Sequence, residues 1–277
     1  MTRLLALLLV TAAAGAAPVP SLDHVVVIVF ENKEQQQVIG SPSAPTFTAL
    51  ARRYARFTNY RAVTHPSLPN YIAMVSGDTQ GIRSNCTSCI VDARNLADTV
   101  EASGRTWKAY AEGLPHPGFT GAVSGRYAKK HMPFLYFRDI VSSTARRANV
   151  VPLTRLRRDL QAGALPNFSL IVPDMCNSMH DCSIRTGDRW LARTIPPLLR
   201  LPNTVVFVTF DEGSARNNVP TLALGTAVRP TTRVATPTGH YGLLRTIEEA
   251  WGLPLLGRSA SAKPLTTIWR DSGSRME

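Results

Sequence analysis

The sequence predicts an α/β fold with a doubly wound, mostly parallel central sheet flanked by helices. Three runs rich in apolar and β-branched residues occur at 24–30, 167–173 and 204–210, and an acidic residue follows each of them. Such runs are typical of strands buried on both faces, as in a parallel sheet covered by helices. Segments with helical patterns lie between them, and this alternation of strands and helices is typical of doubly wound domains.

Several segments are expected to form the helices around this sheet. Glycine or proline residues mark some of their ends, and Pro196-Pro197 is expected to interrupt one of them. Residues 107–110 resemble a further strand, and 113–137, rich in Gly, Pro and aromatic residues, is expected to be an irregular insertion over one sheet edge. The expected helices are 46–54, 70–75, 96–102, 153–161, 188–199 and 242–251.

Residues 1–17 have the pattern of a secretory signal peptide. Arg3 precedes an apolar run that ends at about residue 14, and small residues then lead into Pro18. The run is too short to cross a bilayer, although an uncleaved membrane anchor is the alternative interpretation. We therefore expect export, to the periplasm or as a secreted protein, with residues 18–277 forming a single domain.

The four cysteines fall into two pairs of near neighbours, Cys86 with Cys89 and Cys176 with Cys182. In an oxidising compartment such spacings favour disulfide bonds. A zinc site made from all four is the alternative, but the spacing of the second pair fits a metal site poorly. We therefore expect two disulfides.

The chain is basic, with a formal net charge of +12 at pH 7. Many of the positive charges lie in the middle of the chain, between Arg126 and Arg158. Such a field favours anionic partners, which include phosphate esters, acidic lipid surfaces and nucleic acid. A solvated basic face that only aids solubility explains the same charges, so the charge sets a bias and not a function.

Ser67 lies at or just before the start of an expected helix, because Pro69 is favoured in the first turn of a helix. The unpaired backbone N–H groups and the helix dipole at such a position favour an anion. A serine there can cap the helix, or it can attack a phosphate bound beside it. Position alone leaves both interpretations open.

Carboxylates at the ends of the expected strands favour a chemical role for Ser67. Glu31 and Asn32 follow the first strand, and Asp211-Glu212 follow the third. Ligands bind at the carboxyl edge of open α/β sheets, where these side chains would meet. The chain contains no G-x-S-x-G motif, so we expect a divalent metal bound by carboxylate oxygens to activate the serine.

Two further segments carry histidines and an acid. Asp174 and His180 flank the expected Cys176–Cys182 bridge, which would fix where both side chains point. His240 precedes the last expected helix. A single histidine is more often a structural hydrogen-bonding group than a catalyst, but its pKa would suit a general acid or a phosphate ligand.

Five segments in order resemble the bacterial phosphoesterase family that joins acid phosphatases and phospholipases C, within the alkaline-phosphatase-like superfamily. Together they extend over nearly the whole of residues 18–277. The resemblance implies an alkaline-phosphatase-like core. The segments are DHVVVIVFEN (23–32), THPSLPNYIAMVSG (64–77), VPDMCNSMHDCSIRTGDRWL (172–191), VVFVTFDEG (205–213) and GHYGLLRTIEEAWGLPLLG (239–257).

The resemblance implies roles for the matching residues. Glu31 matches a metal ligand and Asn32 a residue near the phosphate. Ser67 matches the nucleophile, which would also contact the metal, and Asp211 and Glu212 match the paired acids that bind the same metal.

Three more residues match the family less directly. His240 matches the histidine before the last helix, and Asp174 with His180 resembles a second group of ligands. The spacing from Asp174 to His180 is longer than in two-zinc alkaline phosphatases, so we expect one divalent cation, which could be Ca, Mg, Mn, Zn or Fe. The chain also departs from relatives at 33–36, which read Lys-Glu-Gln-Gln.

The sequence therefore predicts an exported, metal-dependent phosphomonoesterase that acts through a phosphoserine at Ser67. Asn32, His65 and Asn70 are expected to bind substrate, and His240 or His180 to activate water. The expected substrates are phosphorylated small molecules or lipid headgroups, for a monomer with no specific nucleic acid partner and with acidic membranes as a candidate contact. A phospholipase C-type phosphodiesterase is one alternative, and a non-catalytic phosphate or acidic-lipid binding protein is another.

Overall fold

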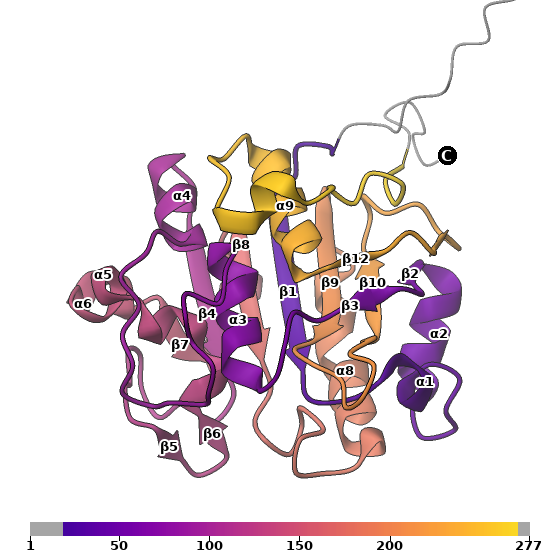
Figure 1. Cartoon of the computed structure of the whole chain (residues 1–277). Coiled ribbons are helices and arrows are strands. Elements are labelled where there is room, and N and C mark those ends of the chain that lie inside the picture. The colour runs from indigo at the N-terminus through magenta and orange to yellow at the C-terminus, as the bar shows by residue number, and fades with distance from the viewer. Residues whose placement is uncertain (1–18, 271–277) are drawn as a thin grey trace, which may run out of the picture.

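Eight strands form one central sheet in the computed structural model, which describes residues 19–270 (Figure 1). The sheet is mostly parallel, and β10 runs antiparallel to both of its neighbours. The predicted signal peptide lies outside the described residues. In sheet order the strands are β11 (Arg233–Val234), β2 (Ala55–Phe57), β10 (Thr221–Leu224), β9 (Thr204–Phe210), β1 (His24–Phe30), β8 (Phe168–Val172), β4 (Trp107–Ala111) and β7 (Val150–Pro152).

Short strands outside the central sheet form two further pairs. β3 (Tyr60–Arg61) pairs in parallel with β12 (Thr238–Gly239), and β5 (Val123–Ser124) pairs with β6 (Tyr127–Ala128). The β3–β12 pair joins the segment before Ser67 to the start of the last helix, so two parts of the chain that are distant in sequence are fixed side by side.

Helices cover both faces of the central sheet. α3 packs against α9 in front of the sheet in Figure 1, while α2 packs against α8. The α-helices are α1 (Gln35–Val38), α2 (Pro45–Arg53), α3 (Ser67–Ser76), α4 (Leu96–Ala102), α5 (Arg138–Val141), α6 (Thr144–Arg147), α7 (Thr154–Gln161), α8 (Ile184–Leu198) and α9 (His240–Trp251), and the 3-10 helices are η1 (Lys129–His131), η2 (Pro133–Tyr136) and η3 (Gly257–Ser261).

The two helical layers bury opposite faces of β1 because successive side chains of a strand alternate between faces. Phe30 packs edge-on against Trp190 of α8 and Phe47 of α2. Val27, on the other face, lines a small apolar cavity together with Tyr71 of α3. The strand is therefore buried on both sides, as its continuous apolar sequence predicts.

Two expectations about helices were wrong in detail. α8 continues through Pro196-Pro197 to Leu198, and the N–H of Leu199 still donates to Ile195 O at 3.2 Å. Each proline lacks the N–H that would bond to the carbonyl four residues earlier, and the helix ends one residue after Pro197. α3 begins at Ser67 and not near residue 70, so the predicted nucleophile is the first residue of the helix.

Both predicted disulfides are present, Cys86–Cys89 and Cys176–Cys182. The second closes the loop after β8. Among residues 19–270, no helix is both long and apolar enough to cross a membrane. The predicted irregular insertion, 113–137, contains the β5–β6 hairpin and two short 3-10 helices, η1 and η2.

Candidate active site

Ser67 and three acidic side chains meet at the carboxyl edge of the central sheet. Glu31 follows β1, and Asp211 and Glu212 follow β9, which is the direct neighbour of β1. The hydroxyl oxygen of Ser67 lies 3.3 Å from Glu31 Oε2 and 3.1 Å from Glu212 Oε1. All four side chains are buried. A hydroxyl between two carboxylates can pass its proton to either of them, which is the arrangement that activates a serine.

Backbone hydrogen bonds fix the two strand ends relative to each other. The N–H of Asp211 donates to Phe30 O at 3.0 Å, and the N–H of Glu31 donates to Ser178 O at 2.9 Å. Asn32 has a φ of 49° and donates its N–H to Asp211 Oδ1 at 3.2 Å. Asparagine tolerates this left-handed conformation better than most residues, so the chain can turn sharply immediately after Glu31.

The structure adds Tyr71 and His131, which the sequence analysis did not single out. The Tyr71 hydroxyl donates to Glu31 Oε1, and His131 Nε2 lies 3.2 Å from Glu31 Oε2. Their rings stack with centroids 5.3 Å apart. Tyr71 lies four residues after Ser67 and so shares its helix face, a signal that the sequence contained. His131 lies in the 113–137 insertion, where no periodic pattern indicates its position.

Burial makes the negative charges of this cluster costly. It raises the pKa of Glu31 to about 7, and burial together with the neighbouring Glu31 carboxylate raises the pKa of Asp211 well above its usual range. Burial also lowers the pKa of His131 to about 3, so this imidazole is neutral at pH 7 and cannot neutralise the acids. Either protons or a cation must offset the repulsion between the carboxylates.

The donor atoms fit a hard divalent cation by their chemistry. Asp211 Oδ2 and Asn32 Oδ1 are buried and have no hydrogen-bond partner within residues 19–270. Carboxylate and amide oxygens are the ligands that Ca²⁺, Mg²⁺ and Mn²⁺ prefer. No three His, Cys, Asp or Glu side chains of the described residues already enclose a metal position. The residue types that bind such a cation are therefore present, but within the described residues they do not surround a metal position.

Positively charged and neutral nitrogen groups surround the acids. His65 Nδ1 bonds to Glu212 Oε2, and 47% of the His65 side chain is exposed. Lys33 Nζ donates to Met179 O at 2.9 Å. Burial lowers the pKa of Lys33, although the charges of Glu31 and Asp211 oppose this shift. His65 is the member of this group placed to reach both the buried acids and solvent.

Asn70 was expected to bind substrate, but the structure gives its side chain another role. Asn70 Oδ1 accepts the N–H groups of Val63 at 2.9 Å and Thr64 at 3.0 Å. Its Nδ2 donates to Thr64 O at 2.8 Å and Pro66 O at 3.1 Å. All four hydrogen-bonding positions of the amide are occupied. Asn70 therefore positions the loop that carries Ser67 and has no donor left for a phosphate.

His240 likewise forms contacts that position other groups of the site, and its predicted role as an acid or base stays a prediction. Its Nε2 contacts Asp211 O at 2.7 Å, and its Nδ1 contacts the Tyr60 hydroxyl at 3.1 Å. The ring is fully buried, which lowers its pKa to about 4. Through these two contacts, His240 connects the backbone of Asp211 to Tyr60 of β3.

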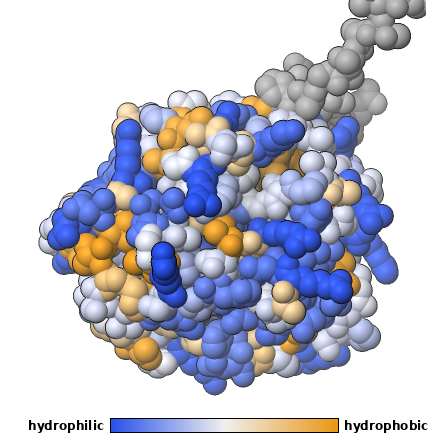
Figure 2. Space-filling model, in the orientation of Figure 1, coloured by the Kyte–Doolittle hydropathy of each residue, from blue (hydrophilic) through white to orange (hydrophobic). Residues whose placement is uncertain are grey.

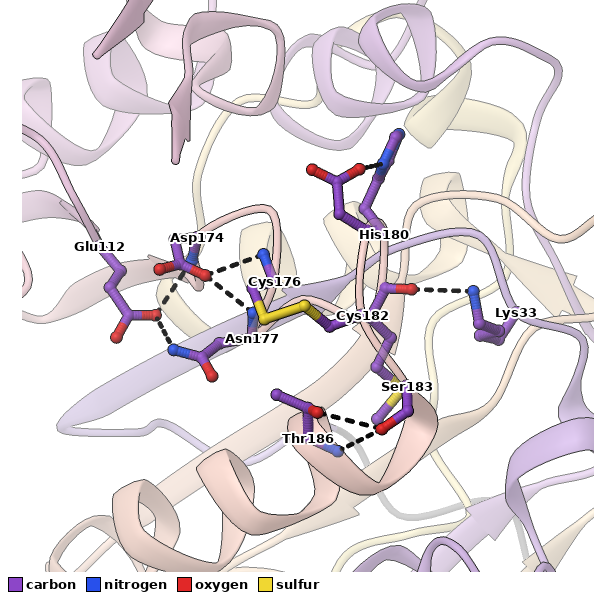
Figure 3. Close-up of a disulfide and its surroundings, with 11 residues drawn as sticks. Lys33, Glu112, Asp174, Cys176, Asn177, His180, Cys182, Ser183 and Thr186 are labelled. Carbon is purple, nitrogen blue, oxygen red and sulfur yellow. Dashed lines mark hydrogen bonds and ion pairs between the residues drawn. A yellow bond between two sulfur atoms is a disulfide. The ribbon is translucent and has the colours of Figure 1, made fainter. Parts of the chain in front are cut away.

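Asp174 and His180 do not form a second ligand group with each other. Asp174 Oδ1 accepts the N–H groups of Cys176 at 2.9 Å and Asn177 at 2.8 Å, so it caps the turn of the disulfide loop. Figure 3 shows this side chain beside Glu112, with His180 pointing away from it. One carboxylate oxygen of Asp174 thus holds the turn, and the role of Asp174 as a metal ligand stays a prediction.

His180 lies closer to the acidic cluster. Its Nδ1 bonds to Asp181 Oδ1 at 2.7 Å, its Nε2 is 3.2 Å from Lys130 Nζ, and its ring centroid is 6.0 Å from that of His131. Burial lowers its pKa, while Asp181 opposes the shift. His180 is therefore at the edge of the site, with the ring of His131 between it and Glu31.

Comparison with known proteins identifies relatives with a shared chemistry. A model of the Phosphoesterase family matches residues 41–254. A phosphatidylinositol-3-phosphatase of Mycobacterium tuberculosis is 37% identical over 265 residues, which cover 93% of this chain and 86% of that protein. A probable acid phosphatase of Kluyveromyces lactis is 31% identical over 250 residues, which cover 84% of this chain and 59% of that protein.

Solved structures share the fold at low sequence identity. A protein of the alkaline phosphatase superfamily from Vibrio parahaemolyticus has a TM-score of 0.63 at 14% identity, covering 90% of this chain and 72% of that chain. Murine ectonucleotide pyrophosphatase/phosphodiesterase 5 has a TM-score of 0.56 at 12% identity, covering 84% and 96%. The chain therefore belongs to the phosphoesterase family and is a hydrolase of phosphoric ester bonds built on the alkaline-phosphatase fold.

Proposed function

We propose that this protein is a metal-dependent phosphomonoesterase that acts through a phosphoserine at Ser67. The observation that carries the proposal is the position of the Ser67 hydroxyl between Glu31 and Glu212 at 3.3 and 3.1 Å. Both carboxylates are buried, so they hold a fixed geometry around the serine oxygen. A cap residue would direct its hydroxyl to the backbone of its own helix, and the Ser67 hydroxyl instead faces the acids.

The first chemical step transfers the phosphoryl group to the protein. Glu212 or Glu31 accepts the proton of the Ser67 hydroxyl, the serine oxygen attacks phosphorus in line, and the bond between phosphorus and the ester oxygen breaks. The leaving alcohol oxygen takes up a proton, for which His65 is the exposed candidate donor. Glu31, Asp211 and Glu212 would hold a divalent cation, which when bound lowers the pKa of the serine hydroxyl and offsets charge on the phosphoryl oxygens.

The second step returns the serine to its resting state. Water attacks the phosphoserine, the Ser67 oxygen leaves and regains a proton, and inorganic phosphate is released. His65, with 47% of its side chain exposed, is the candidate acceptor for the proton of this water, since His240 and His180 each have contacts at both ring nitrogens. Lys33 and Lys130 contribute positive charge on the same side and favour the approach of a dianionic substrate.

The proposed substrates are phosphate monoesters, including those of lipid headgroups. The names of the relatives support this class, because one is a phosphatidylinositol-3-phosphatase and others are acid phosphatases. The two disulfides support an exported, periplasmic or secreted protein, since such bonds persist in oxidising compartments.

Hydrolysis of para-nitrophenyl phosphate by the purified protein, with and without a chelator, tests the proposal. We expect chelator-sensitive release of nitrophenol, restored by adding back a divalent cation. Ser67→Ala should lower kcat by at least about 10³-fold, as expected when a nucleophile is removed. Ser76→Ala, a buried serine at the far end of the same helix, is the matched control and should keep kcat within about 3-fold.

The bis-ester of para-nitrophenol distinguishes the alternative activity. A phosphomonoesterase should cleave the monoester with a much higher kcat/KM than the bis-ester. Faster cleavage of the bis-ester would replace the proposal with a phosphodiesterase. A folded, metal-loaded protein that releases no product from either ester would leave a phosphate-binding protein as the better account.

A further inference from the structure

A second polar pocket lies beside the candidate active site. Its volume is about 370 Å³, and strands at one end of the central sheet line it together with α1 and the loop after β9. Figure 2 shows mostly hydrophilic side chains over the right-hand part of the face where β2 and α1 lie in Figure 1. The lining residues important here are Glu34, Gln35, Arg56, Arg216, Asn218 and Arg233.

Three arginines of this pocket lack an acidic partner. Within residues 19–270, Arg56, Arg216 and Arg233 form no ion pair, and their guanidinium groups make no hydrogen bond. Arg146, by contrast, contacts three acidic side chains on the other side of the sheet. A guanidinium group presents five N–H donors in a planar fork that matches phosphate oxygens. These three arginines therefore bring many guanidinium N–H donors to one pocket.

Two of these arginines are direct neighbours in the sheet. Arg56 of β2 and Arg233 of β11 are register partners in a parallel pair, so their side chains leave the same face of the sheet. Residues paired in this way have Cβ atoms about 5 Å apart, so the two guanidinium groups are close enough to bind the same anion. An anion bound between the two guanidinium groups would form charge-assisted hydrogen bonds with both.

Glu34 is an acidic residue in the lining of the same pocket, but its carboxylate forms no ion pair with the three arginines within residues 19–270. Its Oε1 accepts four backbone N–H groups, those of residues 214–217 at 2.9–3.1 Å, and its Oε2 accepts the N–H of Asn218 at 3.2 Å. Burial opposes ionisation, but these bonds prevail and lower the pKa of Glu34. The carboxylate is therefore committed to holding the loop, and its oxygens face the backbone.

Two side-chain amides line the pocket, and that of Gln35 can add a donor to it. Gln35 Oε1 and Asn218 Oδ1 are buried and lack a hydrogen-bond partner within the described residues. The oxygen and nitrogen of an amide are assigned from their hydrogen bonds, so rotation of the Gln35 amide by 180° would present an NH₂ donor instead, whereas the Asn218 amide is fixed because its Nδ2 donates to Thr58 O at 3.4 Å. An oxyanion in the pocket would satisfy such a donor, whereas a buried amide without a partner is costly.

We propose that this pocket is a second phosphate-binding site next to the catalytic serine. Gln35 and Arg216 each lie four residues after a member of the active site, Glu31 and Glu212, so each pair of Cα atoms is at most ~14 Å apart. The ligand is a phosphate group carried by the substrate at a position remote from the hydrolysed ester, or free inorganic phosphate. The substrate form of the proposal rests on the proposed phosphatase activity.

The double variant Arg56→Gln/Arg233→Gln tests the site. Glucose 1,6-bisphosphate is compared with glucose 1-phosphate, glucose 6-phosphate and para-nitrophenyl phosphate as substrates. Hydrogen bonds to charged groups are stronger than those between neutral groups, so the KM for the bisphosphate should rise at least ~10-fold in the double variant. The KM values for the three monophosphates should stay within about 2-fold, because their single phosphate occupies the catalytic site.

Arg155→Gln/Arg158→Gln removes the same charge from α7, at the opposite end of the sheet, and is the matched control. It should leave all four KM values unchanged. An equal rise of the bisphosphate KM in both double variants would show a general effect of net charge and would overturn the site. An unchanged bisphosphate KM in Arg56→Gln/Arg233→Gln overturns its use by the substrate.

Calorimetric titration with inorganic phosphate tests the site independently of turnover. In the Ser67→Ala background, the wild-type pocket should give one more bound phosphate per chain than the variant with Arg56→Gln/Arg233→Gln. This result without a change in bisphosphate KM identifies free phosphate as the ligand. Equal stoichiometry and affinity in both proteins would overturn the site itself, even if the protein hydrolyses no ester.

Discussion

At the scale of single residues, the site depends on side chains that hold other side chains. Buried neighbours such as Tyr71 contact the acids, and His240 is the clearest case because it contacts the backbone of Asp211. Residues of this kind commonly change affinity or rate 10–100-fold when they are replaced near a metal site. A measurement that responds to proton transfer, such as the pH–rate profile, distinguishes such a positioning role from a chemical one.

Tyr71→Phe should lower kcat/KM for para-nitrophenyl phosphate about 10-fold with little loss of stability. The hydroxyl donates to Glu31, so its removal frees a carboxylate that contacts Ser67. Tyr136→Phe is the matched control, because that hydroxyl is also buried but has no hydrogen-bond partner among the described residues. Equal activity of the two variants would contradict the role assigned to Tyr71.

His240→Gln should reduce both activity and thermal stability while leaving the shape of the pH–rate profile unchanged. Burial lowers the pKa of His240 to about 4, so the ring is already neutral across the pH range above this value. Its loss breaks the contacts with Asp211 and Tyr60, at a cost of about 1–3 kcal/mol for the groups left unsatisfied. Loss of one limb of the pH–rate profile would instead show that His240 transfers a proton.

At the scale of secondary-structure elements, the long central strands could be predicted and the short edge strands could not. β1 and β9 match the expected 24–30 and 204–210 in both bounds, because a continuous β-branched run has few alternatives in a buried sheet. β11 and β3 have two residues each, and their position depends on pairing with distant segments. No local pattern encodes such pairing.

Some residues of the candidate site could likewise be predicted from the sequence, and others could not. The acids at strand ends and Ser67 could be predicted because the carboxyl edge of a parallel sheet brings such residues together. His131 could not, since it belongs to an insertion whose path is set by tertiary packing. Asn70 and His240 were found as polar residues at the right place, but only hydrogen bonds in the fold show that their side chains are already occupied.

Glu34 connects α1 to the loop after β9, and Glu34→Gln tests that connection. A glutamine keeps one acceptor oxygen and replaces the other with a donor, which cannot accept the N–H of Asn218. We expect a loss of about 1–3 kcal/mol in the free energy of unfolding and faster hydrogen exchange at residues 214–218.

Glu249→Gln is the control for that experiment. Glu249 pairs with Arg245 on the surface of α9 and should contribute at most about 0.5 kcal/mol. If Glu34→Gln and Glu249→Gln lowered stability equally, the hydrogen bonds of Glu34 would be no stronger than a surface ion pair.

At the scale of the whole molecule, buried acids should make the fold less stable as the pH rises. Glu248 of α9 accepts the N–H of Leu256 at 2.9 Å and the Ser259 hydroxyl at 2.6 Å. Burial prevails over these bonds and raises its pKa to about 7, above the ordinary value of 4.5. The protonated form is thus favoured by folding, and its stabilisation is complete below about pH 4.5 and lost as the pH rises through 7.

Glu248→Gln should therefore flatten the pH dependence of stability. Between pH 4.5 and 8, we expect the wild-type free energy of unfolding to fall more steeply than that of the variant, by a difference on the order of 1–3 kcal/mol. Urea unfolding at a series of pH values measures this difference, and other titrating groups cancel in the comparison. Parallel curves for the two proteins would show that the Glu248 pKa is not raised in the fold.

Across the whole molecule, a buried acidic cluster lies within a strongly basic chain. The acidic cluster is enclosed at the sheet edge, while Lys33, Lys130 and the arginines of the second pocket surround its approaches. A positive field around a buried acidic centre attracts phosphorylated substrates and leaves the centre free to hold a cation. This distribution of charge suits an enzyme that binds an anionic ester.

Trapping the covalent intermediate tests the central claim most directly. Metal-loaded protein is mixed with para-nitrophenyl phosphate, quenched in acid within the first turnovers, digested and analysed by mass spectrometry. The account predicts one phosphoryl group on the peptide that contains Ser67, absent from Ser67→Ala and present in Ser76→Ala. Active protein that hydrolyses the ester with Ser67 unmodified, and whose Ser67→Ala variant retains its turnover, would contradict it.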